Sequence, residues 1–158
     1  MANVNPGPAV TSTPSTEAVL TQVNTLGPTL PSQGSNAYRL LGSARGVSGN
    51  GTGDAAVIQI VNASSWAPAL IVTANGQVSG VAGSIATLAL GVFTAAAAGG
   101  TAIKANAALT NNSAAGSAIA LATSIVTPAQ TVQTLFVNVG TALANSTVDI
   151  FLYGYDLS

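Results

Sequence analysis

From Asn36 onward, the chain is a series of short apolar segments separated by turn-forming residues. No segment shows the long 3.6-residue periodicity of an amphipathic helix. Many short strands with closely spaced turns are typical of sandwiches and barrels. We therefore predict an all-β fold, an antiparallel β-sandwich of jelly-roll-like type. The predicted strands are Tyr38–Val47, Ala55–Asn62, Ala69–Thr73, Ile85–Phe93, Thr101–Leu109, Ala118–Val126, Thr131–Val139 and Val148–Tyr155.

The segments between these strands are rich in Gly, Asn, Ser and Pro. Asn75-Gly76 is the strongest of these signals, because Asn-Gly is typical of a type I′ hairpin turn. We therefore predict that the chain reverses at this dipeptide. The other predicted turns are GNGTGD at Gly49–Asp54, SSWAP at Ser64–Pro68, TNNSAAG at Thr110–Gly116 and TPA at Thr127–Ala129.

Alternation of side chains predicts which strand faces are buried. In Thr101–Leu109, the large residues Ile103 and Leu109 share one face, and Lys104 and Asn106 point away from it. This strand is expected to have one buried and one solvated face.

The last predicted strand differs, because both of its faces are apolar. One face has Val148, Ile150 and Leu152, and the other has Phe151, Tyr153 and Tyr155 together with Asp149. We predict that the strand is either central in its sheet or covered by a neighbouring subunit. Tyrosine buries a large area while keeping a polar tip, so Phe151, Tyr153 and Tyr155 are candidate interface residues.

Residues 1–35 are a Pro-, Thr- and Ser-rich segment unlike the rest of the chain. Proline fixes φ and favours extended geometry in the residue before it. We predict an extended N-terminal arm with polyproline-like stretches, followed by a β-sandwich domain of residues 36–158. Pro6, Pro8 and Pro14 are expected to contact another subunit. Ser15–Leu26 has a candidate N-cap and many β-branched residues, so both helix and strand remain open for it.

The chain has only 3 Lys+Arg and 4 Asp+Glu, with no His and no Cys. This is 4% charged residues, against about 25% in a typical soluble domain. Arg39, Arg45 and Lys104 are too few to neutralise a phosphate backbone, so we expect no nucleic-acid partner. Such a neutral surface is typical of a chain that packs against other protein.

The same composition excludes most catalytic chemistry. Without histidine there is no Ser-His-Asp triad. The four carboxylates, Glu17, Asp54, Asp149 and Asp156, show no paired spacing. The loop GVSGNGTGDA lacks the lysine of a phosphate-binding loop and has one carboxylate for a calcium site. We predict a non-enzymatic protein with no catalytic residue, cofactor or metal site.

The N-terminus has neither a basic nor an apolar signal region, so we expect no secretory signal. No apolar run is long enough for a standard membrane span, and we expect no membrane partner. The nearest candidate is Ile85–Gly100, which is either a buried strand followed by a small-residue loop or a membrane-active segment.

Trp66, Arg39 and Arg45 each have two interpretations. Trp66 is either a hydrophobic plug at one end of the sandwich or an interface anchor. Arg39 and Arg45 are six residues apart, which predicts that they share a strand face. They are expected to pair with Asp149 or Asp156, or with carboxylates of another protein.

The proline-rich arm, the charge-poor Ala/Thr/Val/Gly-rich domain and the terminal strand VDIFLYGYDLS together resemble tailed-bacteriophage virion structural proteins. The chain is most similar to capsid decoration (cement) proteins. The resemblance implies a homotrimer on the capsid exterior that clamps neighbouring copies of the major capsid protein, with arms reaching across their junctions. Backbone pairing and multivalency would supply stability without charged contacts.

Three other classes have similar compositions. A tail or fibre receptor-binding component would also be β-rich and charge-poor, but no internal repeat is evident. A cell-surface adhesin module is disfavoured by the missing signal. A small hydrolase is disfavoured by the missing nucleophile–base pair.

Overall fold

The computed structural model describes residues 37–113, 119–122 and 128–158. The predicted arm lies outside them, with Pro6, Pro8, Pro14 and the segment Ser15–Leu26. The described elements are β1 (Ala37–Ser48), β2 (Gly53–Gln59), β3 (Trp66–Val78), β4 (Val81–Ala82), β5 (Ala89–Ala95), β6 (Gly99–Ala108), β7 (Ile119–Ala122), β8 (Thr134–Thr141) and β9 (Ser146–Asp156).

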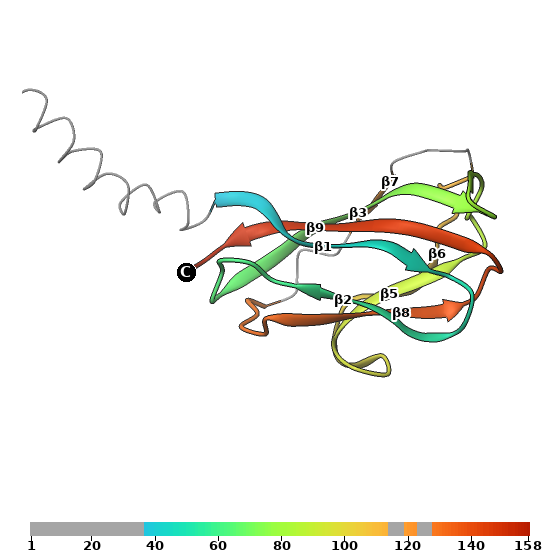
Figure 1. The fold of residues 1–158 in the computed structure, drawn as a ribbon. Helices are drawn as coiled ribbons and strands as arrows, with labels where there is room; N and C mark the ends of the chain where they lie inside the picture. Colours follow the sequence, from blue (N-terminus) through green and yellow to red (C-terminus); the bar gives the residue numbers. More distant parts are fainter. Residues whose placement is uncertain (1–36, 114–118, 123–127) are drawn as a thin grey trace, which may run out of the picture. The chain divides into compact units, whose positions relative to one another are not determined.

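These strands form two antiparallel sheets that pack face to face (Figure 1). Sheet A has the order β1-β9-β3, and β4 and β7 pair with different parts of β3. Sheet B has the order β2-β8-β5-β6. The predicted all-β antiparallel sandwich is confirmed.

The chain connectivity is that of a jelly roll. Apart from the two-residue β4, the chain runs from sheet A to sheet B and back at nearly every step, and only the β5–β6 hairpin stays within one sheet. The first strand, β1, pairs with the last strand, β9, in sheet A, and β2 pairs with β8 in sheet B. Eight strands wound in this way are the double Greek key of a jelly roll.

Large aliphatic residues from both sheets fill the space between them. The fully buried side chains include Leu41, Ile58, Ile71, Leu135 and Leu152. The face prediction for β6 (Gly99–Ala108) holds in part: Ile103 and Leu109, just after the strand, are buried and Asn106 is exposed, but Lys104 is half-buried and Ala105 is exposed.

The predicted hairpin at Asn75-Gly76 is wrong. Both residues lie inside β3, where the register with β9 shifts between Ala74 and Gln77. Asn75 adopts a φ of 53°, so the positive φ that Asn-Gly favours is used for a β-bulge. The chain reverses instead at Ser79-Gly80, whose φ values are 56° and 77°.

The predicted turn at Ser64–Pro68 is also too long, because β3 begins at Trp66. Pro68 cannot donate a ladder hydrogen bond, and a second register shift follows it, between Pro68 and Leu70. Strand β3 is therefore longer than the predicted strand Ala69–Thr73, and it continues through both register shifts.

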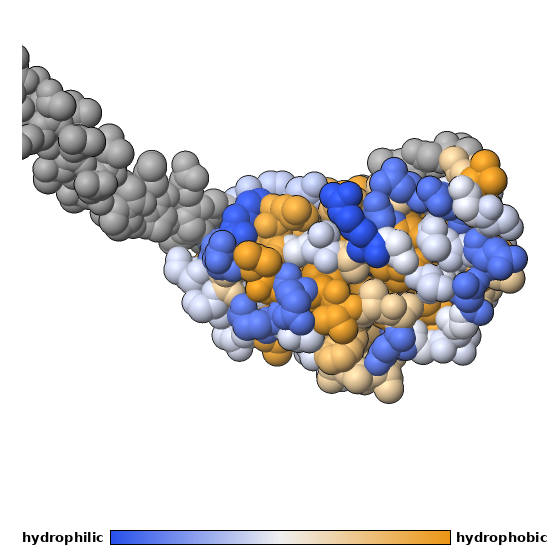
Figure 2. All heavy atoms as spheres, in the orientation of Figure 1, coloured by the Kyte–Doolittle hydropathy of each residue, from blue (hydrophilic) through white to orange (hydrophobic). Residues whose placement is uncertain are grey.

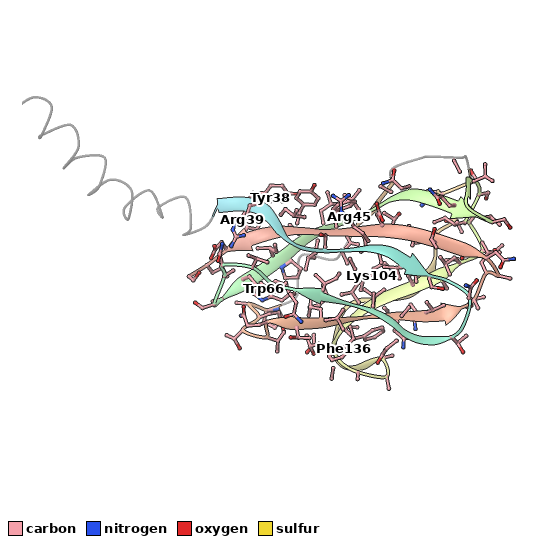
Figure 3. The ribbon with its side chains drawn as sticks, in the orientation of Figure 1. Tyr38, Arg39, Arg45, Trp66, Lys104 and Phe136 are labelled. Atoms are coloured by element: carbon pink, nitrogen blue, oxygen red, sulfur yellow. The ribbon has the colours of Figure 1, made fainter. Side chains whose placement is uncertain are left out.

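Trp66 belongs to the core. Its side chain has 0% exposure, and its indole N–H donates a hydrogen bond to the carbonyl of Val132 at 2.9 Å. Figure 3 shows it between the two sheets. The interpretation of Trp66 as an interface anchor is therefore wrong, because no part of its side chain reaches the surface.

Candidate interaction surface

All three tyrosines of the chain lie together on the outer face of sheet A. Strand β9 alternates strictly between buried and more exposed residues, and Tyr153 and Tyr155 lie on its exposed side. Tyr38 of β1 is opposite Tyr155 in the register. Its ring is stacked on that of Tyr153, with centroids 6.1 Å apart, and meets the Tyr155 ring edge-on at 5.5 Å. We call these three residues the tyrosine cluster.

The tyrosine cluster remains open to solvent. Tyr38 is 51% exposed and Tyr155 is 40% exposed. None of the three phenol hydroxyls hydrogen-bonds to another described residue. Large rings with unengaged hydroxyls can bury area against a partner and also accept or donate hydrogen bonds to it.

Phe151 continues the aromatic row along β9. The guanidinium of Arg45 lies 5.2 Å from the centre of its ring, which is the geometry of a cation–π contact. Next to it, Asp149 accepts hydrogen bonds from the backbone N–H of Gly46 and the side-chain amide of Asn75. The polar groups beside Phe151 are thus held in place by the bulged parts of β1 and β3.

Arg39 and Arg45 lie on opposite faces of β1, so the prediction that they share a face is wrong. The register of β1 with β9 shifts between Leu40 and Gly42, and one extra residue reverses the alternation that follows. Arg45 therefore lies over Phe151, while Arg39 contacts the other side of β9. Figure 3 shows Tyr38 and Arg45 on the outer side of sheet A.

Arg39 forms an ion pair with Asp156, as one of the sequence interpretations predicted. The distance from Nη2 to the carboxylate is 2.8 Å, and the Asp156 side chain is 4% exposed. Arg39 also donates to the carbonyls of Val61 and Asn62. The hydroxyl of Ser158 and then the Arg39 guanidinium lower the pKa of Asp156, against the opposing effect of burial. Asp156 therefore stays ionised at the end of β9.

An apolar groove of about 360 Å³ lies between the edge strands of the two sheets. Its lining is Arg39, Leu40, Leu41, Gly42, Ser43, Val57, Gln59 and Val61. Gly42 allows β1 and β2 to approach here, because a Cβ at this position would lie 2.7 Å from Ile58 Cγ2. The segment after β2 is tied to β1 by a hydrogen bond from Val61 N–H to the Leu41 carbonyl, 2.9 Å long.

The groove and the tyrosine cluster together form one surface, which we call the apolar band. Leu40 connects them, since it lines the groove and lies opposite Tyr153 in the sheet. The band contains five of the six large hydrophobic residues that are exposed in the described part of the chain, namely Tyr38, Leu40, Val57, Val61 and Tyr155. Figure 2 shows hydrophobic residues gathered over β1 and β2 on this face.

The outer face of sheet B has a different chemistry. Asp54 accepts a hydrogen bond from Asn138, and Asn138 in turn accepts one from Asn106. Asp54 also accepts the backbone N–H of Ala97 in the β5–β6 turn, where Ala97 and Ala98 have positive φ. The Asn138 and Ala97 hydrogen bonds lower the pKa of Asp54. These polar groups are already engaged with one another.

The structure brings together the predicted interface residues Phe151, Tyr153 and Tyr155 on one face. Sequence reasoning missed Tyr38, Leu40, Val57 and Val61. An available signal was that Tyr38 opens the first predicted strand and that the first and last strands of a jelly roll are neighbours. Val57 and Val61 gave no signal, because single exposed apolar residues are normal on protein surfaces.

No group of three or more His, Cys, Asp or Glu residues is placed to hold a metal ion within the described ranges. The part of the chain that the structure describes also has no helix long and apolar enough to cross a membrane. Comparisons of the chain with protein-family models, curated proteins and solved structures found no match.

Proposed function

We propose that the protein is a structural subunit of a bacteriophage virion that binds the capsid exterior as a decoration (cement) protein and does no enzymatic work. The observation that carries this proposal is the apolar band. Large exposed apolar patches are found at protein–protein and membrane contacts and at ligand-binding grooves, and a protein contact is the case that the charge-poor composition favours. Tyrosine is one of the residue types enriched among the residues that contribute most binding energy to such contacts.

The location on a capsid is supported by the resemblance of the sequence to decoration proteins and, by analogy, by the fold. Jelly rolls occur in viral capsid domains and also in lectin domains. A fold alone does not decide a function, so the partner must be identified by binding. A homotrimer on the shell would present three apolar bands, and symmetry would multiply modest contacts.

The test is co-sedimentation of the full chain with capsid shells of the phage that encodes it, prepared without this protein. We expect binding that saturates at a fixed ratio to the major capsid protein. Tyr38→Ala should weaken binding at least about tenfold, because it removes an exposed ring from the band. Val81→Ala is the matched control, since Val81 is 68% exposed but lies outside the band.

Three outcomes would overturn the proposal. The first is that the chain does not co-sediment with capsid shells at any protein concentration. The second is binding that Tyr38→Ala and Val81→Ala leave equally intact. The third is binding to host cells or their glycans in place of capsids, which would support the receptor-binding or adhesin alternatives.

A further inference from the structure

The groove between β1 and β2 has walls suited to an extended apolar peptide. Leu40, Val57 and Val61 are exposed along it, and Arg39, Ser43 and Gln59 add polar groups to its lining. Covering these exposed aliphatic side chains removes apolar surface from water, which is favourable. An occupant with several aliphatic residues and little charge would therefore be favoured.

We propose that this groove receives the N-terminal arm of a second copy of the chain. The inference goes beyond the proposed function, because it concerns the contact between copies and not the contact with the capsid. It concerns the groove end of the apolar band and leaves the tyrosine cluster for another partner.

The position and length of the arm support this choice. The chain before β1 ends at Asn36, and β1 supplies five of the eight groove residues, from Arg39 to Ser43. Thirty-five extended residues span up to about 115 Å. A domain of this size has a radius of gyration of about 14 Å. An arm can thus reach the groove of a neighbouring copy and extend well beyond it.

The chemistry of the arm matches the groove. Ser15–Leu26 is free of proline and contains Val19, Leu20, Val23 and Leu26. Glu17 is the only charged side chain among residues 1–35. This stretch can bury aliphatic residues in the groove at little cost in desolvated charge.

A second copy is a better source of the arm than the same chain. Only five residues separate Pro31 from β1, so a returning arm would place Leu26–Pro31 against its own groove. Backbone N–H groups alternate in direction along an extended segment, and Pro28 and Pro31 are an odd number of residues apart. One of the two prolines would therefore occupy a position whose N–H should bond to β1, and proline has no N–H. An arm from another copy has no such restriction on register. Because each arm starts beside a groove, mutual exchange can close into a symmetric oligomer.

The test uses cysteine cross-linking of the full chain, which has no natural cysteine. Chains with one arm cysteine (Leu20→Cys, Val23→Cys or Leu26→Cys) are mixed with Val57→Cys chains of different mass, and oxidised without capsids. We expect at least one arm position to give mixed disulfides with Val57→Cys about tenfold above those with Val81→Cys, because arm exchange raises the local concentration. Val81 is the more exposed of the two, at 68% against 45%, so accessibility favours the control.

Equal yields with Val57→Cys and Val81→Cys at all three arm positions would overturn the inference. The inference would also be overturned if a chain with both Val23→Cys and Val57→Cys formed only an intramolecular disulfide on dilution. A chain that binds capsids but shows no preferential cross-link loses this inference and keeps the proposed function. A chain that cross-links as expected but does not bind capsids keeps this inference and loses the proposed function.

Discussion

The tyrosine cluster on the outer face of sheet A and the asparagine–aspartate row on the outer face of sheet B differ in whether their polar groups are engaged. On sheet B, Asp54, Asn138 and Asn106 form a hydrogen-bonded row. On sheet A, the three tyrosines contact one another through their rings, and their hydroxyls have no hydrogen bond to another described residue. Residues of the sheet B row therefore contribute to the stability of this domain. The tyrosines of sheet A have unused capacity for a partner.

The largest effect is expected from removing two members of the tyrosine cluster. Tyr153→Ala with Tyr155→Ala should weaken capsid binding by about 3 kcal/mol, or roughly a hundredfold. The unfolding free energy should also fall, by about 0.5–1.5 kcal/mol for each lost ring pair in addition to the contribution of the apolar area that the two rings bury. Binding isotherms and denaturant unfolding of the same variant give both values. If the variant lost stability but bound capsids normally, the tyrosines would contribute to stability and not to capsid binding, which would contradict the account.

Asn138→Ala on sheet B should have the opposite effect: it should lower stability and leave capsid binding almost unchanged. It removes the hydrogen bond between Asn106 and Asn138 and one of the hydrogen bonds to Asp54, which keeps the one from the Ala97 backbone N–H, so we expect about 2 kcal/mol less stability. Capsid affinity should stay within about twofold of the native value, because the residue is outside the apolar band. Urea unfolding and co-sedimentation measure the pair of effects. Loss of affinity in a folded Asn138→Ala chain would show that sheet B also binds.

A third substitution tests the end of sheet A, where the ion pair holds β1 to β9. Arg39→Met keeps the aliphatic stem but leaves the buried Asp156 carboxylate without its cation. We expect a loss of about 1–2 kcal/mol in unfolding free energy. The double variant Arg39→Met with Asp156→Asn should lose less than the sum of the single variants. Strict additivity would mean that the ion pair contributes nothing.

The smallest effect is expected from acid. Asp54 and Asp156 both have pKa values below their ordinary value of 3.8 in the folded chain. Their stabilising contribution is therefore complete above about pH 4 to 5 and is lost as the pH falls through their lowered values. The thermal midpoint should be constant between about pH 5 and 7, because the chain has no histidine. A midpoint that stays constant in stronger acid would contradict both assignments.

How far the sequence predicted this molecule depends on the bulges. Strand β9 has no extra residue, so simple alternation correctly separated Val148, Ile150 and Leu152 from the aromatic residues. Strands β1 and β3 each have two register shifts. The predictions that Arg39 and Arg45 share a face and that the chain reverses at Asn75-Gly76 were wrong there. A bulge needs only one residue, and nothing in the local sequence separates an Asn-Gly bulge from an Asn-Gly turn.

The interaction surface was predicted in part for a related reason. Phe151, Tyr153 and Tyr155 are close in sequence, so one strand showed them together. Tyr38 joins them only because the jelly roll makes β1 and β9 neighbours. The groove depends on β1 and β2 meeting from different sheets at Gly42, which no single strand reveals.

The central claim is that the apolar band is covered when the protein is on a capsid. Hydroxyl-radical footprinting with mass spectrometry measures this directly, by comparing side-chain oxidation in the free and capsid-bound full chain. We expect Tyr38 and Tyr155 to be strongly protected on the capsid, and Val81 to react equally in both states. Equal reactivity of the two tyrosines in the free and bound chain would contradict the claim.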